Sequence, residues 1–220
     1  MAREAIGDRG FFSVALAGGT TPKAAYALLA QEPRSRDVDW QRVFAYFSDE
    51  RCVPPDDPQS NYKTAHDALL SKVSIPTGNV HRMRGEDSPA AAASAYARLL
   101  RGEFGDPPRF DLVMLGMGPD GHTASLFPGT DPLTDDGALV RAPFVDQVHA
   151  FRLTITPRVI NAARCVTIAT EGVEKASALA RVREGARDPA ALPIQIVAPS
   201  DGRLLWLVDR AAASALRAKS

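Results

Sequence analysis

Residues 110–130 of this 220-residue chain read FDLVMLGMGPDGHTASLFPGT. The apolar run 112–115 is short and continuous, a pattern typical of a strand that is buried on both faces. It stops at residues 116–121, where three glycines and a proline prevent a strand or a helix from continuing. Polar side chains follow at once: Asp120, His122, Thr123 and Ser125. Because open α/β sheets hold their ligands beyond the carboxyl ends of buried strands, this stretch predicts an active site.

Asp120 and His122 are the titratable residues of this turn. Histidine exchanges a proton near neutral pH, and a nearby carboxylate orients the ring and favours its charged form. A short helix is expected between His122 and Pro128, and its first N–H groups would stabilise an oxygen that becomes negative during a reaction. The turn therefore predicts acid–base chemistry at His122.

Other kinds of site fit the sequence poorly. Residues 116–121 match G-x-G-x-x-G, but Pro128 soon cuts the following helix, and no acidic residue ends a second strand ~20 residues on. The serine motif G-x-S-x-G is absent. The four histidines are scattered without ligand spacing or a cysteine partner. The sequence therefore gives no support for a metal site or for a bound dinucleotide.

A second glycine turn lies near the start of the chain. The expected strand 11–17 stops at Gly18, Gly19, Thr20, Thr21 and Pro22. Thr21 fits an N-cap and Pro22 the first position of a helix that runs to about residue 31. This arrangement would point free N–H groups and a positive helix end at one place, which favours phosphate binding. An ordinary strand-to-helix turn is the alternative.

The remaining segments alternate between strand and helix patterns. Strands are expected at 43–48, 151–156 and 165–170, with a closing hairpin from 194–198 and 204–209. Helices are expected after Ser60, Ser88 and Gly172 and at 210–218. This alternation predicts one α/β domain over residues 1–220, with a mostly parallel sheet covered on both faces. The irregular segment 128–150 is long enough to be a functional lid.

Composition excludes several classes of function. Lys plus Arg and Asp plus Glu are both 26, so the balanced charge gives no reason to expect nucleic acid or a membrane surface as a partner. Cys52 and Cys165 are expected to be free structural thiols, as in a reducing cytosol. The first ten residues lack the apolar core of a signal peptide, and no apolar run is long enough to span a membrane. We expect a soluble cytoplasmic protein.

Three segments together resemble the 6-phosphogluconolactonase family: ALAGGTTPKAAY (15–26), FSDERCVPPDDPQSNY (47–62) and FDLVMLGMGPDGHTASLFPG (110–129). Residues 153–164 and 172–176 fit the same pattern. The related sugar-phosphate isomerase/deaminase branch shares the Gly-Asp-Gly-His turn, but an Asn- and Glu-containing tail follows its histidine. Here the tail is Thr-Ala-Ser-Leu-Phe-Pro, which favours the lactonase branch.

The resemblance implies a three-layer α/β/α sandwich with a Rossmann-like sheet, in which the family's N-terminal strand and helix are shortened. It implies hydrolysis of 6-phosphoglucono-δ-lactone to 6-phosphogluconate in the oxidative pentose phosphate pathway, without metal or cofactor. Ala17 departs from the family pattern, because many relatives carry Ser or Thr there. One hydroxyl contact to phosphate is then missing. We expect a monomer, or at most a weak dimer.

The resemblance also implies roles for single residues. His122 would move protons with Asp120 orienting it, and Asp49 and Arg51 would line the opposite wall. Judged from the sequence pattern alone, residues 49–51 are more typical of a solvated loop than of a site. The expected phosphate ligands are Gly18, Gly19, Thr20 and Thr21, with charge added by Lys175 and Arg158. Each of the last two fits a solvated helix position as well. Two rivals stay open: an amino-sugar-phosphate isomerase or deaminase, and a non-catalytic sugar-phosphate sensor.

Overall fold

The computed structural model describes residues 1–130, 133 and 137–217. Its larger sheet has five strands in the order β2-β1-β4-β8-β9, and every neighbouring pair is parallel. The strands are β1 (Phe12–Leu16), β2 (Val43–Phe47), β4 (Leu112–Gly116), β8 (Cys165–Thr170) and β9 (Arg203–Val208). The predicted mostly parallel sheet is confirmed.

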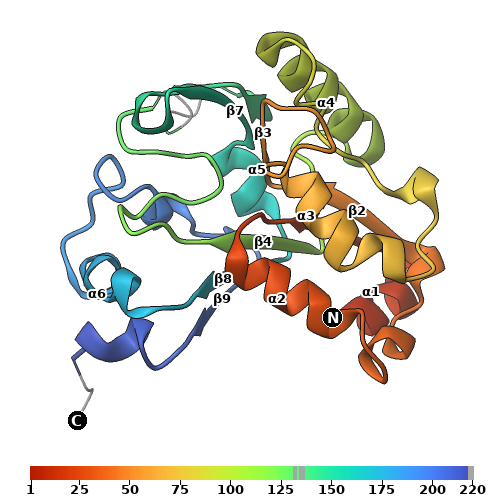
Figure 1. Cartoon of the computed structure of the whole chain (residues 1–220), viewed down its shortest axis with the longest axis horizontal. Coiled ribbons are helices and arrows are strands. Elements are labelled where there is room, and N and C mark those ends of the chain that lie inside the picture. Colours follow the sequence, from red (N-terminus) through yellow and green to blue (C-terminus); the bar gives the residue numbers. More distant parts are fainter. Residues whose placement is uncertain (131–132, 134–136, 218–220) are drawn as a thin grey trace.

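Helices cover both faces of this sheet (Figure 1). Residues of β1 alternate between the faces, so Val14 and Leu16 pack in one hydrophobic cluster and Ala15 in the other. The first cluster includes α1 (Ala2–Arg9), α2 (Thr20–Leu29) and α3 (Asn61–Ala68). The second includes α4 (Pro89–Phe104), α5 (Pro157–Ala162) and α6 (Ala176–Glu184). These layers form the expected α/β/α sandwich.

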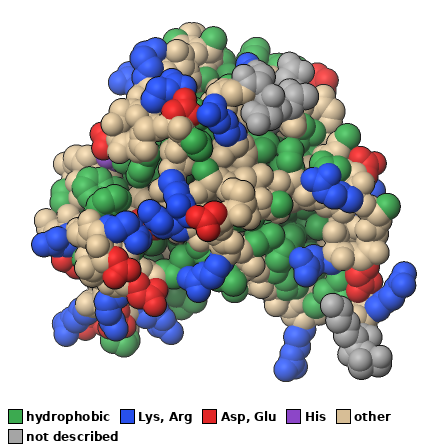
Figure 2. Space-filling view, turned by 180° about the vertical axis from the view of Figure 1, so that it is seen from behind, with side chains coloured by type: hydrophobic (Ala, Val, Ile, Leu, Met, Phe, Trp, Pro, Cys, Tyr) green, Lys and Arg blue, Asp and Glu red, His purple; other side chains and the backbone are tan. Residues whose placement is uncertain are grey.

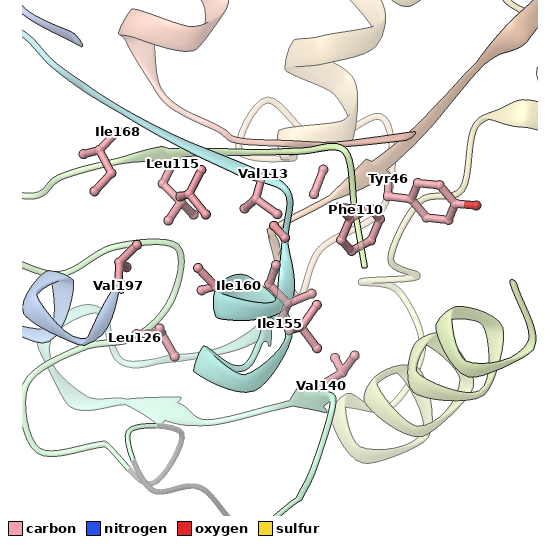
Figure 3. Close-up of a cluster of buried hydrophobic side chains, with 14 of the residues drawn as sticks. Tyr46, Phe110, Val113, Leu115, Leu126, Val140, Ile155, Ile160, Ile168 and Val197 are labelled. Atoms are coloured by element: carbon pink, nitrogen blue, oxygen red, sulfur yellow. The ribbon is translucent and has the colours of Figure 1, made fainter. Parts of the chain in front are cut away.

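The second cluster contains the side chains that fix β4 in place (Figure 3). Val113 and Leu115 of β4 pack with Ile168 of β8 and Ile160 of α5, and all four are at most 1% exposed. Burial of an aliphatic side chain of this size contributes about 1.5–3 kcal/mol. This face of the strand that leads to the second glycine turn is therefore anchored in the core.

A smaller antiparallel sheet lies at the top of Figure 1. It pairs β7 (Ala150–Ile155) with β3 (Asp49–Arg51), β5 (Val140–Arg141) and β6 (Phe144–Val145). Residues 49–51 therefore form a strand and not a solvated loop. Ser48 links the two sheets, because its N–H donates to Leu16 O and its carbonyl accepts from Ile155 N, both at 2.9 Å.

The predicted closing hairpin is wrong. Residues Pro193–Ile196 form a 3-10 helix, and β9 runs parallel to β8. Ile194 is buried, and its N–H donates to the carbonyl of Gly121 at 2.9 Å. The segment therefore packs against the second glycine turn, which removes it as a partner for β9.

Three predicted helix details also differ. The helix predicted after His122 does not form: Thr123 and Leu126 make a bridged turn, because Leu126 is buried in the core. Gly19, with φ 101°, is the N-cap of α2 in place of Thr21. The helix predicted at 210–218 is a short 3-10 turn, Ala212–Ala215, and residue 218 lies outside the described residues.

The proposed lid lies partly outside the described residues, at 131–132 and 134–136. Its later part contributes β5 and β6 to the small sheet. Both cysteines are free thiols. In the described part of the chain no helix has the length and apolar character that crossing a membrane requires. On the face seen in Figure 2, basic and acidic side chains are interspersed.

Candidate active site

The two glycine turns follow neighbouring strands of the large sheet. From β1 the chain proceeds to β2 on one side, while β4 pairs with the other side of β1. Parallel α/β sheets bind ligands at such a reversal of strand order. An open pocket of about 220 Å³ lies there. Most of the predicted site residues line it: Gly18, Gly19, Thr20, Thr21, Asp49, Arg51, His122 and Lys175.

The first glycine turn brings the backbone to one wall of the pocket. Gly19 takes up a left-handed conformation and starts α2, whose first N–H groups have no partner within the helix. Gly18 lies against the side chain of Asn61, and a Cβ at position 18 would overlap its amide. Glycine is therefore required where the strand turns into the helix.

The second glycine turn is closed by its own backbone. The N–H of Gly118 donates to His122 O at 2.9 Å, and the N–H of Gly121 donates to Gly118 O at 3.0 Å. A Cβ on Gly118 would overlap the imidazole of His122 and the carboxylate of Asp120. Gly121 has φ 81°. These glycines let the turn fold tightly enough to hold the histidine and the carboxylate together.

The imidazole of His122 is fixed on one edge and one face. Its Nδ1 lies 2.5 Å from Asp120 Oδ1, which also accepts from the backbone N–H of His122 at 3.1 Å. An ionised carboxylate only accepts hydrogen bonds, so Nδ1 carries the proton and Nε2 stays available to a ligand. The ring stacks on Phe127, with centroids 4.2 Å apart and planes inclined by 19°.

The carboxyl group of Asp120 stays ionised beside this ring. Its burial raises the pKa, but the hydrogen bond and charge of His122, together with backbone N–H groups, lower the pKa below its ordinary value. A carboxylate placed in this way stabilises the positive imidazolium that forms when Nε2 takes up a proton.

Asp49 also lines the pocket and is held by neutral donors. It is 7% exposed. Ser125 Oγ donates to Asp49 Oδ2 at 2.8 Å, and Asn61 Nδ2 donates to Asp49 Oδ1 at 3.2 Å and to its carbonyl at 2.9 Å. The Ser125 N–H donates to Thr154 Oγ1 at 3.3 Å. The turn that carries His122 is therefore tied to both β3 and β7.

Glu50, between the two pocket residues of β3, has a structural role. Alternate residues of a strand face opposite sides, so Glu50 points away from Asp49 and Arg51. Its carboxylate is buried and accepts from the backbone N–H groups of Arg51, Asn61 and Tyr62 and from Ser60 Oγ at 2.7–3.0 Å. Burial raises the pKa of Glu50, and these backbone hydrogen bonds partly oppose the rise.

The predicted cations are distributed unevenly. Lys175 lines the pocket and its Nζ donates to Met117 O at 2.6 Å, while Arg51 donates to Gln59 O at 2.6 Å. Arg158 does not line the pocket: it pairs with Asp106 at 2.8 Å and donates to Gly137 O at 2.7 Å. The structure therefore does not bring Arg158 to the expected phosphate site.

The sequence reasoning missed several neighbours of the site. Asn61 links Gly18 to Asp49, and Phe127 supports the imidazole ring. In the sequence Asn61 looks like an ordinary residue in the first turn of a helix. It lines the pocket only because α3 packs against β3. Among the described residues, no group of three or more His, Cys, Asp or Glu side chains is placed to hold a metal ion.

Comparison with known proteins agrees with this geometry. Residues 1–206 match the family model of glucosamine-6-phosphate isomerases/6-phosphogluconolactonase. A 6-phosphogluconolactonase of Nostoc sp. is 39% identical over 217 residues, which cover 96% of this chain and 88% of that protein.

Solved structures extend the comparison to the fold. The structure titled devB protein has a TM-score of 0.90 at 32% identity, and the match covers 98% of this chain and 93% of that one. The 6-phosphogluconolactonase from Trypanosoma brucei has a TM-score of 0.85 at 28% identity, with the same coverage. The chain therefore belongs to the glucosamine-6-phosphate isomerase/6-phosphogluconolactonase family.

Proposed function

We propose that this protein is a hydrolase that converts 6-phospho-D-glucono-1,5-lactone to 6-phosphogluconate. The observation that carries the proposal is the shared pocket: the Gly18–Gly19 turn and the His122 imidazole, with Asp120 behind it, border the same cavity. One wall offers donors for a phosphate, and the other offers a proton-transfer group for the lactone ring. The sequence and structural likeness to named 6-phosphogluconolactonases supports the same substrate.

The phosphate end of the substrate would be held by the first glycine turn. Backbone N–H groups at the start of α2 and the hydroxyls of Thr20 and Thr21 supply donors, and the helix end supplies partial positive charge. Lys175 adds a full charge at the border of the pocket. Because these contacts lie away from the reacting carbon, they bind the substrate and the product about equally.

The chemistry would take place at His122. Nε2 accepts a proton from a water molecule while the water oxygen bonds to the lactone carbonyl carbon, which gives a tetrahedral intermediate. The intermediate collapses with cleavage of the bond between this carbon and the ring oxygen, and Nε2 returns the proton to that oxygen. Asp120 stabilises the imidazolium between these steps. A δ-lactone is an activated ester, so no covalent nucleophile is required.

The wall opposite the imidazole would orient the sugar. The carboxylate of Asp49 is an acceptor for sugar hydroxyls, and its two oxygens are already positioned by Ser125 and Asn61. Arg51, two residues on along the same face of β3, supplies a positive charge for oxygen atoms of the substrate.

The direct test is acid release from freshly prepared 6-phosphogluconolactone, followed with and without the protein. We expect hydrolysis well above the spontaneous rate. Ammonia released from glucosamine 6-phosphate without lactone hydrolysis would instead indicate a deaminase. Binding of 6-phosphogluconate with no hydrolysis above the background would indicate a sensor, and either result would overturn the proposal.

We also infer a cytoplasmic location, in which the protein acts as one domain over residues 1–220 and as a monomer or weak dimer. The free thiols Cys52 and Cys165 and the likeness to bacterial enzymes support the location. Sedimentation of the purified protein at several concentrations measures the oligomeric state.

A further inference from the structure

Two arginines lie directly opposite each other in the small sheet. The register of the antiparallel pair β3–β7 places Arg51 opposite Arg152, two positions along from the pair Asp49 and Thr154. Side chains of opposed residues project from the same face of a sheet, and like charges in such a pair destabilise it. Both arginines are half-buried, which strengthens their repulsion.

Neither guanidinium is in direct contact with a carboxylate among the residues that the structure describes. In the described part of the chain, Arg51 and Arg152 form no ion pair within 4 Å, and each donates one hydrogen bond to a backbone carbonyl: Gln59 O and Phe151 O. A guanidinium has five N–H donors, so most of them stay available. Many other arginines do pair with carboxylates: Arg3, Arg9, Arg36, Arg82, Arg84, Arg101, Arg109, Arg158 and Arg217.

Arg51 lines the pocket, and Arg152 is its cross-strand neighbour, although Arg152 does not itself line the pocket. Asp49 and Arg51 are two residues apart on β3, share one face and both line the pocket. Arg152 occupies the position next to Arg51 on that face. Burial, and next the charge of Arg51, lower the pKa of Arg152, while Asp49 and Glu50 oppose this change. The Arg152 side chain therefore lies within the electrostatic reach of the pocket wall.

We propose that Arg51 and Arg152 together bind an anionic group of the substrate, which makes Arg152 a substrate-binding residue. The inference rests on the proposed function, since a sugar-phosphate lactone carries a phosphate and gains a carboxylate on hydrolysis. An oxyanion between two guanidinium groups relieves their repulsion and accepts paired charge-assisted hydrogen bonds. The phosphate and the carboxylate can both bind in this way, so the test uses one ligand that carries both groups and one that carries only the phosphate.

The test measures ligand binding by calorimetry for wild type, Arg152→Met and Arg158→Met. Methionine keeps an unbranched stem and removes the charge, and Arg158 is the control because it pairs with Asp106 outside the pocket. The ligands are 6-phosphogluconate, which carries both anions, and glucitol 6-phosphate, which lacks the carboxylate. We expect Arg152→Met to weaken the binding of 6-phosphogluconate about 10- to 100-fold, because charge-assisted hydrogen bonds are lost. The control Arg158→Met should change this affinity little.

Each outcome decides the question. Weaker binding of both ligands places the phosphate at the arginine pair, and weaker binding of 6-phosphogluconate alone places the carboxylate there. Unchanged binding of both ligands by Arg152→Met overturns the inference. The unliganded variant is expected to melt at or above the wild-type temperature, because a repulsion is removed. A purely structural role would lower the melting temperature and leave affinity per folded molecule intact.

Calorimetry also separates this inference from the proposed function. If the wild-type protein binds 6-phosphogluconate but does not hydrolyse the lactone, the proposed function is overturned and the inferred binding role of Arg152 still stands. A wild type that binds neither ligand overturns both. If Arg152→Met does not fold, Arg152→Gln is measured in its place, and Arg152→Lys is expected to keep part of the affinity.

Discussion

Two polar segments, each directly after an apolar strand, differ in what they do. After β4, Asp120 and His122 are partly exposed, with 40% and 28% of their side-chain surfaces accessible, and they contact each other. After β2, Asp49 and Glu50 are 7% and 2% exposed and accept hydrogen bonds from several neighbours. In the first segment His122 lines the pocket and Asp120 contacts it from behind. In the second, Asp49 lines the pocket and the buried Glu50 holds the start of α3 in place. Charge after a strand therefore marks the position of a site but not the role of each residue.

The contrast teaches that exposure and partners separate reactive groups from structural ones. A carboxylate surrounded by donors, such as Glu50, has no capacity left for a ligand. The Nε2 of His122 is different. The hydrogen bond at Nδ1 and the stacking on Phe127 fix the ring, and neither contact uses Nε2. Six test substitutions, one of them measured at two pH values, break or sharpen this comparison.

The largest effect is expected at His122. His122→Ala removes the proton-transfer group and should lower kcat about 10²- to 10⁴-fold, with little change in the Kd of 6-phosphogluconate. Stopped-flow acid release gives kcat and calorimetry gives Kd. His66→Ala is the control, because His66 lies on α3 beside Asp67 and does not line the pocket. A His122→Ala variant with wild-type turnover would end the assigned role.

Glu50→Ala should act on stability and not on chemistry. It leaves three backbone N–H groups, one buried and two partly buried, without their acceptor, so we expect the free energy of unfolding to fall by about 2–4 kcal/mol. Urea unfolding measures the loss, with the exposed Glu103→Ala as the control. Asp49→Asn should give the opposite pattern: lower activity with near-wild-type stability. If both variants lose activity and neither loses stability, the two carboxylates have the same kind of role.

Gly18→Ala tests the close approach in the first glycine turn. The new methyl group would overlap the amide of Asn61, which positions Asp49, so we expect a KM about tenfold higher, which corresponds to ~1.4 kcal/mol. Gly78→Ala is the matched control, since a Cβ there meets nothing within 4 Å. Equal kinetics for the two variants would show that the turn tolerates a side chain.

Lys175→Ala should chiefly affect binding. Loss of one partly exposed cation near the phosphate is expected to raise KM about three- to tenfold and to leave kcat within about twofold. Steady-state kinetics over a range of lactone concentrations measure both constants, with the exposed Lys72→Ala as the control. A fall in kcat at unchanged KM would instead place Lys175 at the reacting carbon.

The smallest effect concerns an ion pair that belongs to neither polar segment. Arg82 donates two hydrogen bonds to Glu86 at 2.7–2.8 Å and lowers the pKa of Glu86 to about 2. A lowered carboxyl pKa stabilises the fold at pH values above the ordinary pKa of 4.5. This contribution disappears as the pH falls through about 2. Because about a quarter of each side chain stays accessible to water, which screens the charges, Arg82→Gln should cost no more than about 1 kcal/mol at pH 7. Urea unfolding of both proteins at pH 7 and pH 3 should show the difference shrinking at low pH, and a growing difference would contradict it.

Local sequence determined the parts of this protein that depend on neighbouring residues. The apolar runs gave the parallel strands because alternation and length are local, and the glycine-rich ends located both turns of the pocket. Tight turns need glycine for steric reasons that involve only a few residues, so their signal is readable. The contact between Asp120 and His122 can be predicted for the same reason, because two residues of one tight turn lie close together independently of the rest of the fold.

Contacts between distant segments were decided only by the tertiary structure. Burial of Leu126 replaced an expected helix with a turn, and packing of Ile194 on Gly121 replaced an expected hairpin with a 3-10 helix. Arg158 and Arg152 lie on consecutive elements and look alike in sequence, but only sheet register places Arg152 opposite Arg51. Register, burial and partner choice sum over the whole core, so no window of the sequence contains them.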